Sequence, residues 1–226
     1  MNIPKKIAII VAGGSGSRLN ASLPKQFLPI GGIPMLAYSI IAFHQEDPET
    51  EIIVVLPEGF DDQWKKLAHE AHIDIPHKIV PGGHERFYSV SNALHTLRPH
   101  QAVVAIHDAA RPFASVPLIR QAFHQATKTG SAIPAIGVKD SIRVKSLDSW
   151  AVIDRSLVRA IQTPQVFELE PLKKAYEHPH HLAFTDDATV YESAGYTINL
   201  IEGEDRNIKV TTPADLEYAE YLMSRS

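Results

Sequence analysis

Short apolar runs alternate with longer amphipathic stretches along almost the whole chain. Residues 6–11 (KIAIIV) and 51–56 (EIIVVL) are almost continuously apolar, as expected of parallel strands buried on both faces of a sheet. Pro34 marks the start of a helix, and Thr212 and Pro213 form an N-cap and first turn for another. The remaining pattern predicts strands at 78–80, 102–113, 131–138 and 197–203, and helices at 35–43, 61–72, 85–97, before Gly130, and at 169–177, 186–194 and 211–224. This order predicts an α/β fold, a doubly wound and mostly parallel Rossmann-like sheet with helices on both faces.

The alternation breaks at residues 139–156 (KDSIRVKSLDSWAVIDRS). Strand-like alternation around an Asp-Ser pair predicts a protruding β-hairpin arm there instead of a helix. An arm that leaves a compact sheet needs a partner surface, so we expect a dimerisation arm and a homodimer. Because no linker, repeat or low-complexity segment interrupts the chain, residues 1–226 are interpreted as a single domain.

The amino-acid composition excludes several kinds of site and partner. The 226 residues include no cysteine, which excludes a disulfide framework, a cysteine-ligated zinc or iron–sulfur centre and a thiol nucleophile. The 22 basic and 26 acidic residues give a net charge of −4, so we expect neither nucleic acid nor a membrane as partner. No apolar run has the length of a signal-peptide core or a membrane span. These features predict a cytoplasmic protein.

A glycine-rich loop, AGGSGSRLNASLPKQF, follows the first predicted strand at residues 12–27. Ligands of parallel α/β sheets bind where strands end, and glycines let backbone N–H groups close on an anion. Arg18 and Lys25 add two cations to the loop. It is not a Walker A loop, which needs Gly-Lys-Ser/Thr, and the third glycine of a dinucleotide fingerprint is replaced by Leu19. We therefore expect a different kind of phosphate loop, with its backbone contacts from Ala12, Gly13, Gly14, Ser15 and Gly16.

Six blocks of sequence occur in order: residues 12–27, PGGHERFYSV (81–90), HDAARPF (107–113), QTPQVF (162–167), FTDDATVYE (184–192) and EGEDRNIKVTTPADL (202–216). The first resembles the signature loop of the sugar-phosphate nucleotidyltransferases. Together they resemble the 2-C-methyl-D-erythritol 4-phosphate cytidylyltransferase family of the non-mevalonate isoprenoid pathway. This resemblance implies an enzyme that transfers CMP from CTP to that polyol phosphate, with pyrophosphate as the second product. It also implies a homodimer and Mg²⁺, or another divalent cation, as cofactor.

The implied chemistry joins two anions. A substrate phosphate attacks the α-phosphorus of CTP, and pyrophosphate leaves. Repulsion between the reactants and charge on the α-phosphoryl oxygens form the main barrier, so positioned cations and Mg²⁺ supply most of the catalysis. A phosphate monoester is already ionised near neutral pH, so the reaction requires no general base.

The resemblance gives the catalytic roles to four cations. Arg18 and Lys25 would bind the triphosphate and stabilise the transition state, while Arg155 and Lys209 would align the attacking phosphate. The positions matched to nucleotide binding are Ala12, Gly13, Gly14, Ser15, Gly16, Gly83, His84, Arg86, Ser89 and Asp108.

Asp108 ends a predicted strand, where it could orient the ribose, a substrate hydroxyl or hydrated Mg²⁺. The metal would be held mainly by the CTP phosphates, with no direct protein ligand apart from this carboxylate. Two positions depart from the family pattern: Ser141 replaces a common threonine in the arm, and Ser17 replaces a second basic residue found in some relatives. The positions matched to the polyol phosphate are Asp108, Arg111, Ser141, Arg155, Thr163, Thr185 and Lys209.

Other functions fit parts of the pattern. His107-Asp108 suggests a metal hydrolase, but no second ligand set stands at metal spacing, and HPHH (178–181) is interpreted as an exposed turn. Asp186-Asp187 fits Mg²⁺ coordination and a helix cap equally well. The alternatives to the implied function are a cytidylyltransferase for another polyol phosphate, such as ribitol 5-phosphate, and a non-catalytic nucleotide-binding module. A nicotinamide dehydrogenase is disfavoured by the missing glycine.

Overall fold

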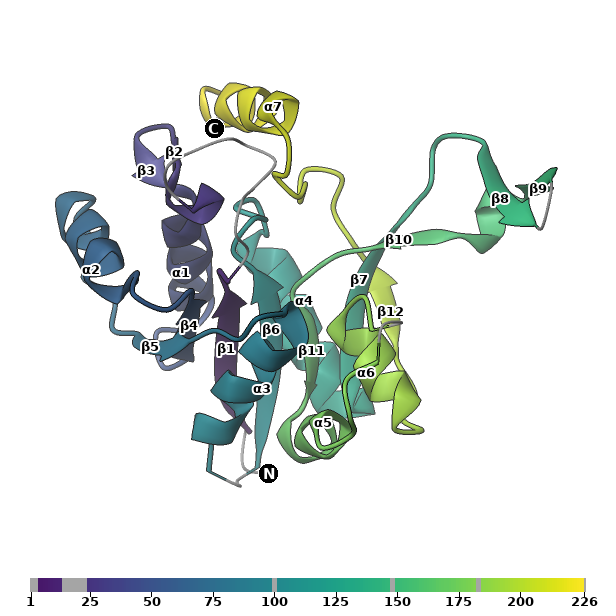
Figure 1. Cartoon of the computed structure of the whole chain (residues 1–226), viewed down its shortest axis with the longest axis horizontal. Helices are drawn as coiled ribbons and strands as arrows, with labels where there is room; N and C mark the ends of the chain where they lie inside the picture. Colours follow the sequence, from purple (N-terminus) through teal and green to yellow (C-terminus); the bar gives the residue numbers. More distant parts are fainter. Residues whose placement is uncertain (1–3, 14–23, 99–100, 147–148, 182–183, 226) are drawn as a thin grey trace.

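A twisted sheet forms the centre of the computed structural model (Figure 1). The structure describes residues 4–13, 24–98, 101–146, 149–181 and 184–225. Within these ranges the sheet consists of β1 (Lys5–Val11), β4 (Glu51–Leu56), β5 (Lys78–Pro81), β6 (Ala102–Asp108), β7 (Ser131–Gly137), β10 (Arg159–Ile161), β11 (Gln165–Glu168) and β12 (Leu200–Glu202). The main order is β10-β7-β11-β6-β1-β4-β5, and β12 pairs with β7. The parallel run β6-β1-β4-β5 confirms the predicted α/β fold.

Two short strands after the arm run against this direction. β11 pairs antiparallel with β6 and β7, and β10 pairs antiparallel with β7. The sequence pattern predicted neither strand. β10 has three residues and β11 has four, which is too short to show an alternation of polar and apolar side chains, and β11 begins with the buried polar Gln165. Their pairing brings the segment before β11 alongside the end of β6.

Helices cover both faces of the sheet, as predicted. The described helices are α1 (Met35–Glu46), α2 (Asp61–Glu70), α3 (Arg86–Thr96), α4 (Val116–Thr129), α5 (Leu169–Tyr176), α6 (Asp187–Ser193) and α7 (Pro213–Met223). α1, α2 and α4 pack on one apolar core, and α3, α5 and α6 pack on the other. In β1, Ala8 and Ile10 point into the first core and Ile7 and Ile9 into the second, because successive side chains of a strand face opposite ways. All four are fully buried, which explains the continuous apolar run.

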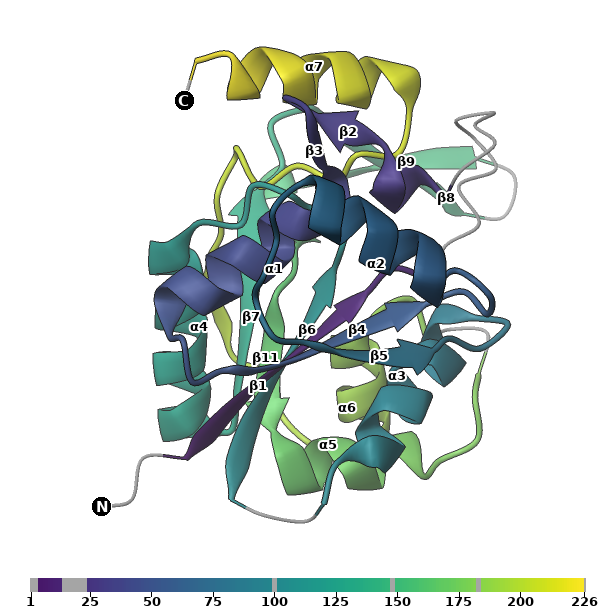
Figure 2. The same cartoon turned by 90° about the vertical axis from the view of Figure 1, so that its left-hand side faces the viewer.

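The C-terminal helix α7 lies above the carboxyl ends of the parallel strands, beside a small hairpin of β2 (Pro29–Ile30) and β3 (Ile33–Pro34) (Figure 2). The predicted N-cap is confirmed. The Thr212 hydroxyl accepts from the Asp215 N–H, and the Asp215 carboxylate accepts from the Thr212 N–H at 2.8 Å. This capping box satisfies two backbone groups that a helix start leaves unpaired, so the start of α7 is fixed locally.

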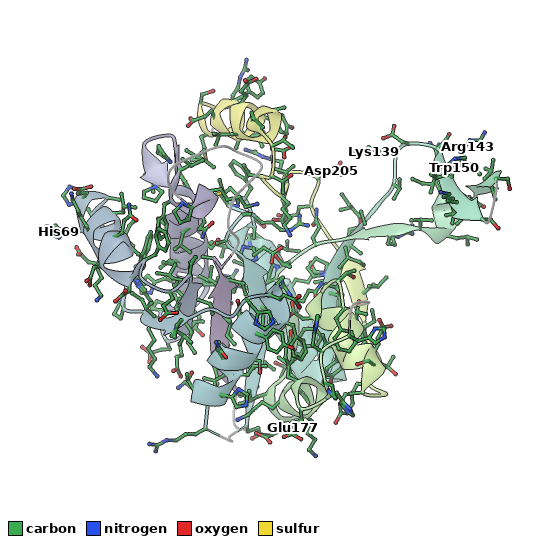
Figure 3. The ribbon with its side chains drawn as sticks, in the orientation of Figure 1. His69, Lys139, Arg143, Trp150, Glu177 and Asp205 are labelled. Atoms are coloured by element: carbon green, nitrogen blue, oxygen red, sulfur yellow. The ribbon has the colours of Figure 1, made fainter. Side chains whose placement is uncertain are left out.

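The predicted arm is a hairpin of β8 (Ile142–Ser146) and β9 (Ser149–Ile153), followed by the 3₁₀ turn η3 (Arg155–Leu157). It projects from the body beyond β10, with Trp150 near its far end (Figures 1 and 3). Among the described residues, these two strands pair only with each other. Trp150 is 63% exposed and Val152 69% exposed. A lone two-stranded hairpin is marginally stable in water, and exposed apolar side chains are frequent where proteins bind one another.

Loops from several strands meet at the carboxyl edge of the parallel run. The Ala109 N–H, just after β6, donates to the Val11 carbonyl at 3.0 Å, and the Gly82 N–H, just after β5, donates to the Leu56 carbonyl at 2.7 Å. These bonds hold neighbouring strand ends level with one another. This edge is where ligands of open α/β sheets bind.

Candidate active site

A cavity of about 350 Å³ opens at this edge of the sheet. Its walls come from the ends of β1 and β6, the turn between β5 and α3, and the segment before α7. The lining includes residues from four of the six sequence blocks: Ala12, Gly13, Lys25, Gly83, His84, Arg86, Ser89, Asp108 and Lys209. The fold therefore brings these residues, which were predicted from separate sequence blocks, together in one site.

Lys25 reaches the cavity from a short, well-anchored 3₁₀ turn, η2 (Lys25–Phe27). Phe27 at its end is buried and stacks on Trp64 of α2, with ring centroids 5.9 Å apart. The Lys25 ammonium donates to the Val210 carbonyl at 3.1 Å. An apolar anchor two residues away thus fixes the position of a cation at the cavity wall.

The turn after β5 requires glycine at position 83. A β-carbon there would lie 2.4 Å from the Tyr88 β-carbon, closer than real contacts allow. The Gly83 N–H donates to the Ser89 hydroxyl at 3.0 Å, and that hydroxyl donates to the Glu85 carbonyl at 3.1 Å. Ser89 therefore holds the turn closed over the first turn of α3 and leaves backbone groups facing the cavity.

Arg86 joins two carboxylates from distant parts of the chain. Its Nη1 and Nη2 atoms donate to Asp187 at 2.9 and 2.6 Å, and its Nε atom donates to Asp108 at 3.0 Å. The Tyr176 hydroxyl also donates to Asp187 at 2.6 Å. Burial alone would lower the pKa of Arg86, but the two carboxylates outweigh it and raise that pKa well above its ordinary value. The guanidinium is therefore a permanent, oriented charge.

Asp108 lies between Arg86 and Lys209. Its second oxygen is 2.7 Å from the Lys209 ammonium. Burial would raise the pKa of Asp108, but the two cations prevail and hold it well below its usual range. Asp108 is thus ionised at neutral pH, and it holds Lys209, which is partly exposed, at the cavity rim. Because Lys25 lines the same cavity, the arrangement suits a polyanionic ligand.

Arg111 does not line the cavity. Its guanidinium donates to the Asn207 carbonyl at 2.8 Å and to the Ile161 carbonyl at 3.3 Å, and its Nε atom is buried without a hydrogen-bond partner. In this conformation it links the turn after β6 to the two segments beside it.

Thr163 and His107 also lie beneath the cavity wall and do not line it. The Thr163 hydroxyl is 3.0 Å from the Asp108 amide nitrogen and 3.1 Å from His107 Nδ1. His107 is fully buried, and this desolvation lowers its pKa to about 4. His107 is therefore neutral across the physiological range.

His107 should make the protein less stable as the pH falls. In the unfolded chain the pKa of His107 is 6.5. Between pH 6.5 and about pH 4, His107 is therefore protonated in the unfolded state and neutral in the folded state. The free energy of unfolding is expected to fall through this window by on the order of 3 kcal/mol, and the effect levels off below it. Urea unfolding of the wild type and of His107→Gln across this pH range checks the expectation. The variant should show a flatter pH dependence, and equal slopes would contradict it.

The other predicted site residues lie elsewhere in the protomer. Arg155 lines a second cavity, of about 640 Å³, at the base of the arm, beside the Lys139–Asp205 ion pair of 2.7 Å (Figure 3). Ser141 is exposed at the start of the arm, and Thr185 is exposed just before α6. The fold of this chain does not bring these three to the first cavity. Predictions at Gly14, Ser15, Gly16, Ser17 and Arg18 lie outside the described residues.

Both carboxylates of the Asp186-Asp187 pair bond to protein groups, and neither residue lines the cavity. Asp186 is the N-cap of α6, where its side chain accepts from the Thr189 N–H at 2.9 Å. Asp187 is fully buried against Arg86. These contacts favour the cap over Mg²⁺ coordination, and they give Asp187 an ion-pair role that the sequence did not suggest.

The predicted exposed turn at HPHH is wrong for His180. Its imidazole packs against Phe87 and Phe184, and its Nε2 atom lies 3.1 Å from the Glu85 carboxylate. Phe87 lies in α3, far from His180 in the sequence, so the local pattern did not indicate that His180 is half-buried.

Two polar lining residues were missed in the sequence. Gln26 is buried, and its amide donates to the Ala12 carbonyl. Glu85 lines the cavity in the turn before α3. Both belong to blocks that carried the resemblance, so block membership was a signal that residue-type arguments did not use.

Among the described residues, no three histidine or acidic side chains gather as a metal site. None of the helices in this part of the chain combines the length and apolarity needed to cross a membrane.

Comparison with known proteins gives a consistent family. The sequence model of the 2-C-methyl-D-erythritol 4-phosphate cytidylyltransferases matches residues 6–225. The enzyme of that name from Bacteroides fragilis is 44% identical over 96% of this chain and 99% of its own length. Its counterpart from Bacteroides thetaiotaomicron is 41% identical over 97% of this chain and 100% of its own length.

Solved structures agree with the sequence comparisons. The 4-diphosphocytidyl-2C-methyl-D-erythritol synthase of Anaerococcus prevotii superposes with a TM-score of 0.84 at 28% identity, covering 98% of this chain and 97% of that one. The 2-C-methyl-D-erythritol 4-phosphate cytidylyltransferase of Thermus thermophilus superposes with a TM-score of 0.78 at 28% identity, covering 97% and 99%. The similarity therefore extends over nearly the whole chain.

Proposed function

Because the chain belongs to the 2-C-methyl-D-erythritol 4-phosphate cytidylyltransferase family, we propose that it transfers CMP from CTP to 2-C-methyl-D-erythritol 4-phosphate. The products are 4-diphosphocytidyl-2-C-methyl-D-erythritol and pyrophosphate, in the non-mevalonate isoprenoid pathway. The observation that carries the proposal is one cavity at the strand ends, lined by Lys25, Arg86 and Lys209, in a chain whose net charge is negative. We further propose a cytoplasmic location, where CTP is available.

The nucleoside of CTP is proposed to bind on the glycine side of the cavity. Gly13 and Gly83 line the cavity there, and Ser89 holds the turn at Gly83 through the Gly83 N–H. A β-carbon at Gly13 would lie 3.1 Å from the Ser89 hydroxyl, so the two walls approach closely. A narrow slot with backbone donors and acceptors suits the edge of a pyrimidine base.

The transferring phosphoryl group is proposed to lie between Lys25 and Lys209. Lys25, together with Arg18 of the glycine-rich loop, would bind the triphosphate and stabilise the charge that develops on the α-phosphoryl oxygens. Lys209, held by Asp108, would align the attacking phosphate. Since Asp108 stays ionised and ion-paired, it orients groups and does not transfer a proton.

Mg²⁺ is proposed as the cofactor. This ion is usually bound through one or two carboxylates together with substrate phosphates, and Asp108 in the cavity wall fits that pattern. When bound, the ion would neutralise charge on the triphosphate and its pyrophosphate leaving group. Asp108 would contribute an ionised oxygen to the hydrated metal.

A homodimer with exchanged arms is proposed because one protomer leaves Arg155 and Ser141 away from the first cavity. The arm exposes apolar side chains on a projecting hairpin, which supports its docking on a second copy of the chain. Each arm would then bring its Arg155 to the attacking phosphate in the other protomer.

Mixing two inactive variants is expected to restore activity if sites are shared. A hybrid dimer of Lys25→Ala and Arg155→Ala protomers contains one site with both cations intact. Co-refolding equal amounts should give roughly a quarter of wild-type turnover, since half of the dimers are hybrid and half of their sites are intact. Each variant refolded alone is the control. A mixture no more active than its components would contradict arm exchange.

Pyrophosphate release measures the proposed reaction directly. With CTP and Mg²⁺, release is expected with 2-C-methyl-D-erythritol 4-phosphate and not with ribitol 5-phosphate, and ATP, GTP and UTP should support little. Release with ribitol 5-phosphate alone would retain the fold and mechanism but replace the substrate. Binding of CTP with no release from either acceptor would refute the proposed function.

A further inference from the structure

A chain of hydrogen bonds runs beneath the catalytic edge, through two buried side chains. The Asp108 N–H donates to the Thr163 hydroxyl at 3.0 Å, that hydroxyl lies 3.1 Å from His107 Nδ1, and His107 Nε2 lies 3.1 Å from the Arg111 carbonyl oxygen. Thr163 is 4% exposed and His107 is fully buried. Neither lines the cavity, although the chain begins at a residue that does.

The partners at the two ends fix every proton in this chain. The Arg111 carbonyl can only accept, so His107 Nε2 carries the hydrogen. The Asp108 amide can only donate, so the Thr163 oxygen accepts there and its single hydrogen points to His107 Nδ1. Both ends therefore require the same Nε2–H tautomer, and the Thr163 hydroxyl hydrogen is committed to the histidine.

This chain of hydrogen bonds spans the turn at residues 108–111, which carries the Asp108 carboxylate. Asp108 begins the turn and Arg111 ends it. Between them, the Ala110 carbonyl accepts from the Val210 N–H at 2.8 Å, next to Lys209. Any shift of the turn would therefore move the Asp108 carboxylate relative to the ammonium group that it holds.

We propose that His107 is a positioning residue of the reaction: as the Nε2–H tautomer it links Thr163 to the turn at 108–111, so that Asp108 keeps Lys209 aimed into the cavity. Thr163 then acts on Asp108 through the backbone N–H whose hydrogen bond its hydroxyl accepts. The kinetic part of this proposal rests on the proposed cytidylyl transfer, whereas the tautomer does not.

Nitrogen NMR of histidine-labelled protein tests the tautomer without any substrate. The His107 signals, identified by their loss in His107→Gln, should show a protonated Nε2 and a bare Nδ1 near neutral pH. In Thr163→Val the Nδ1 resonance should shift, because the hydroxyl that donates to it is gone. An Nδ1–H tautomer, or an Nδ1 resonance unchanged in Thr163→Val, would overturn the proposal.

Kinetics of a matched pair of threonine variants test the positioning. Thr163→Val keeps the shape of the side chain and removes the hydroxyl, and we expect kcat to fall by about 10- to 100-fold with KM for CTP little changed. Thr163→Ser restores the hydroxyl and should recover most of that loss. A serine variant as slow as the valine variant would overturn the proposal, as would a loss confined to KM for the polyol phosphate.

A double variant tests whether Thr163 and His107 act through one chain of hydrogen bonds or have two independent effects. If His107 and Thr163 act through one chain, His107→Gln combined with Thr163→Val should be little slower than the slower single variant. A loss of kcat equal to the product of the two single losses would contradict a shared chain of hydrogen bonds. A wild type without activity in the same assay would refute the proposed function, while the tautomer measurement would still decide the hydrogen-bond chain.

Discussion

Replacing Lys25 by alanine is expected to lower kcat by on the order of 10²- to 10³-fold, equivalent to about 3–4 kcal/mol of transition-state stabilisation. The ammonium group lines the cavity from a turn that Phe27 and Trp64 hold in place, so it is oriented before the substrate binds. A preorganised cation acts most strongly where charge increases in the transition state, here on the α-phosphoryl oxygens. The loss should therefore appear in kcat more than in KM for CTP.

Two further variants make this test specific. Lys25→Met keeps most of the length of the side chain and removes the charge, so it should be as slow as Lys25→Ala if charge is the cause. Lys65→Ala removes an exposed lysine of α2 that pairs with Asp61 and Asp62, and it should leave turnover unchanged. A Lys25→Met enzyme with near-normal kcat would exclude the proposed role.

Replacing Asp187 by asparagine is expected to lower the free energy of unfolding by about 3 kcal/mol or more. Asp187 is fully buried and accepts from Arg86 twice and from Tyr176 once. Breaking this buried pair removes the bidentate partner of Arg86 and leaves only Asp108 to compensate its charge, which costs more than the pair itself contributes. Part of Arg86 remains in contact with solvent, which places the expected loss near the lower end of the usual range.

Chemical denaturation at neutral pH measures this loss, with Asp62→Asn as the control. Asp62 pairs with Lys65 on the surface and is 91% exposed, so its variant should unfold at the wild-type midpoint. Arg86→Met in the Asp187→Asn background should be less damaging than in the wild type, because it removes a charge that has already lost its bidentate partner. Equal unfolding midpoints for Asp187→Asn and Asp62→Asn would show that the pair does not stabilise the fold. Asp187→Asn should also lose activity, since Asp187 would no longer hold Arg86 in its position beside Asp108.

Much of the fold was predictable because its signals are local. Residues 7–11 are apolar at every position since both faces of β1 are covered, and that information lies within neighbouring residues of one strand. Thr212 and Pro213 specify the start of α7 in the same way. The hairpin arm was visible as a change from helical to alternating patterning. Strands β10 and β11 were not visible, because three or four residues hold too little pattern to distinguish them from loop.

The sequence by itself determined which residue types could form an anion site and in which blocks they stand, through the glycine-rich loop after β1 and the cations of the later blocks. Only the tertiary structure decided how they are used. Arg86 meets Asp187 across 101 residues and His107 meets Thr163 across 56, and these pairs form because β11 and α6 pack beside β6 and α3. The same packing turns Arg111 onto backbone carbonyls and leaves Arg155 at the base of the arm. The physical reason is that periodicity and capping depend on neighbours in sequence, whereas ion pairs and buried hydrogen bonds depend on which distant segments the hydrophobic core brings into contact.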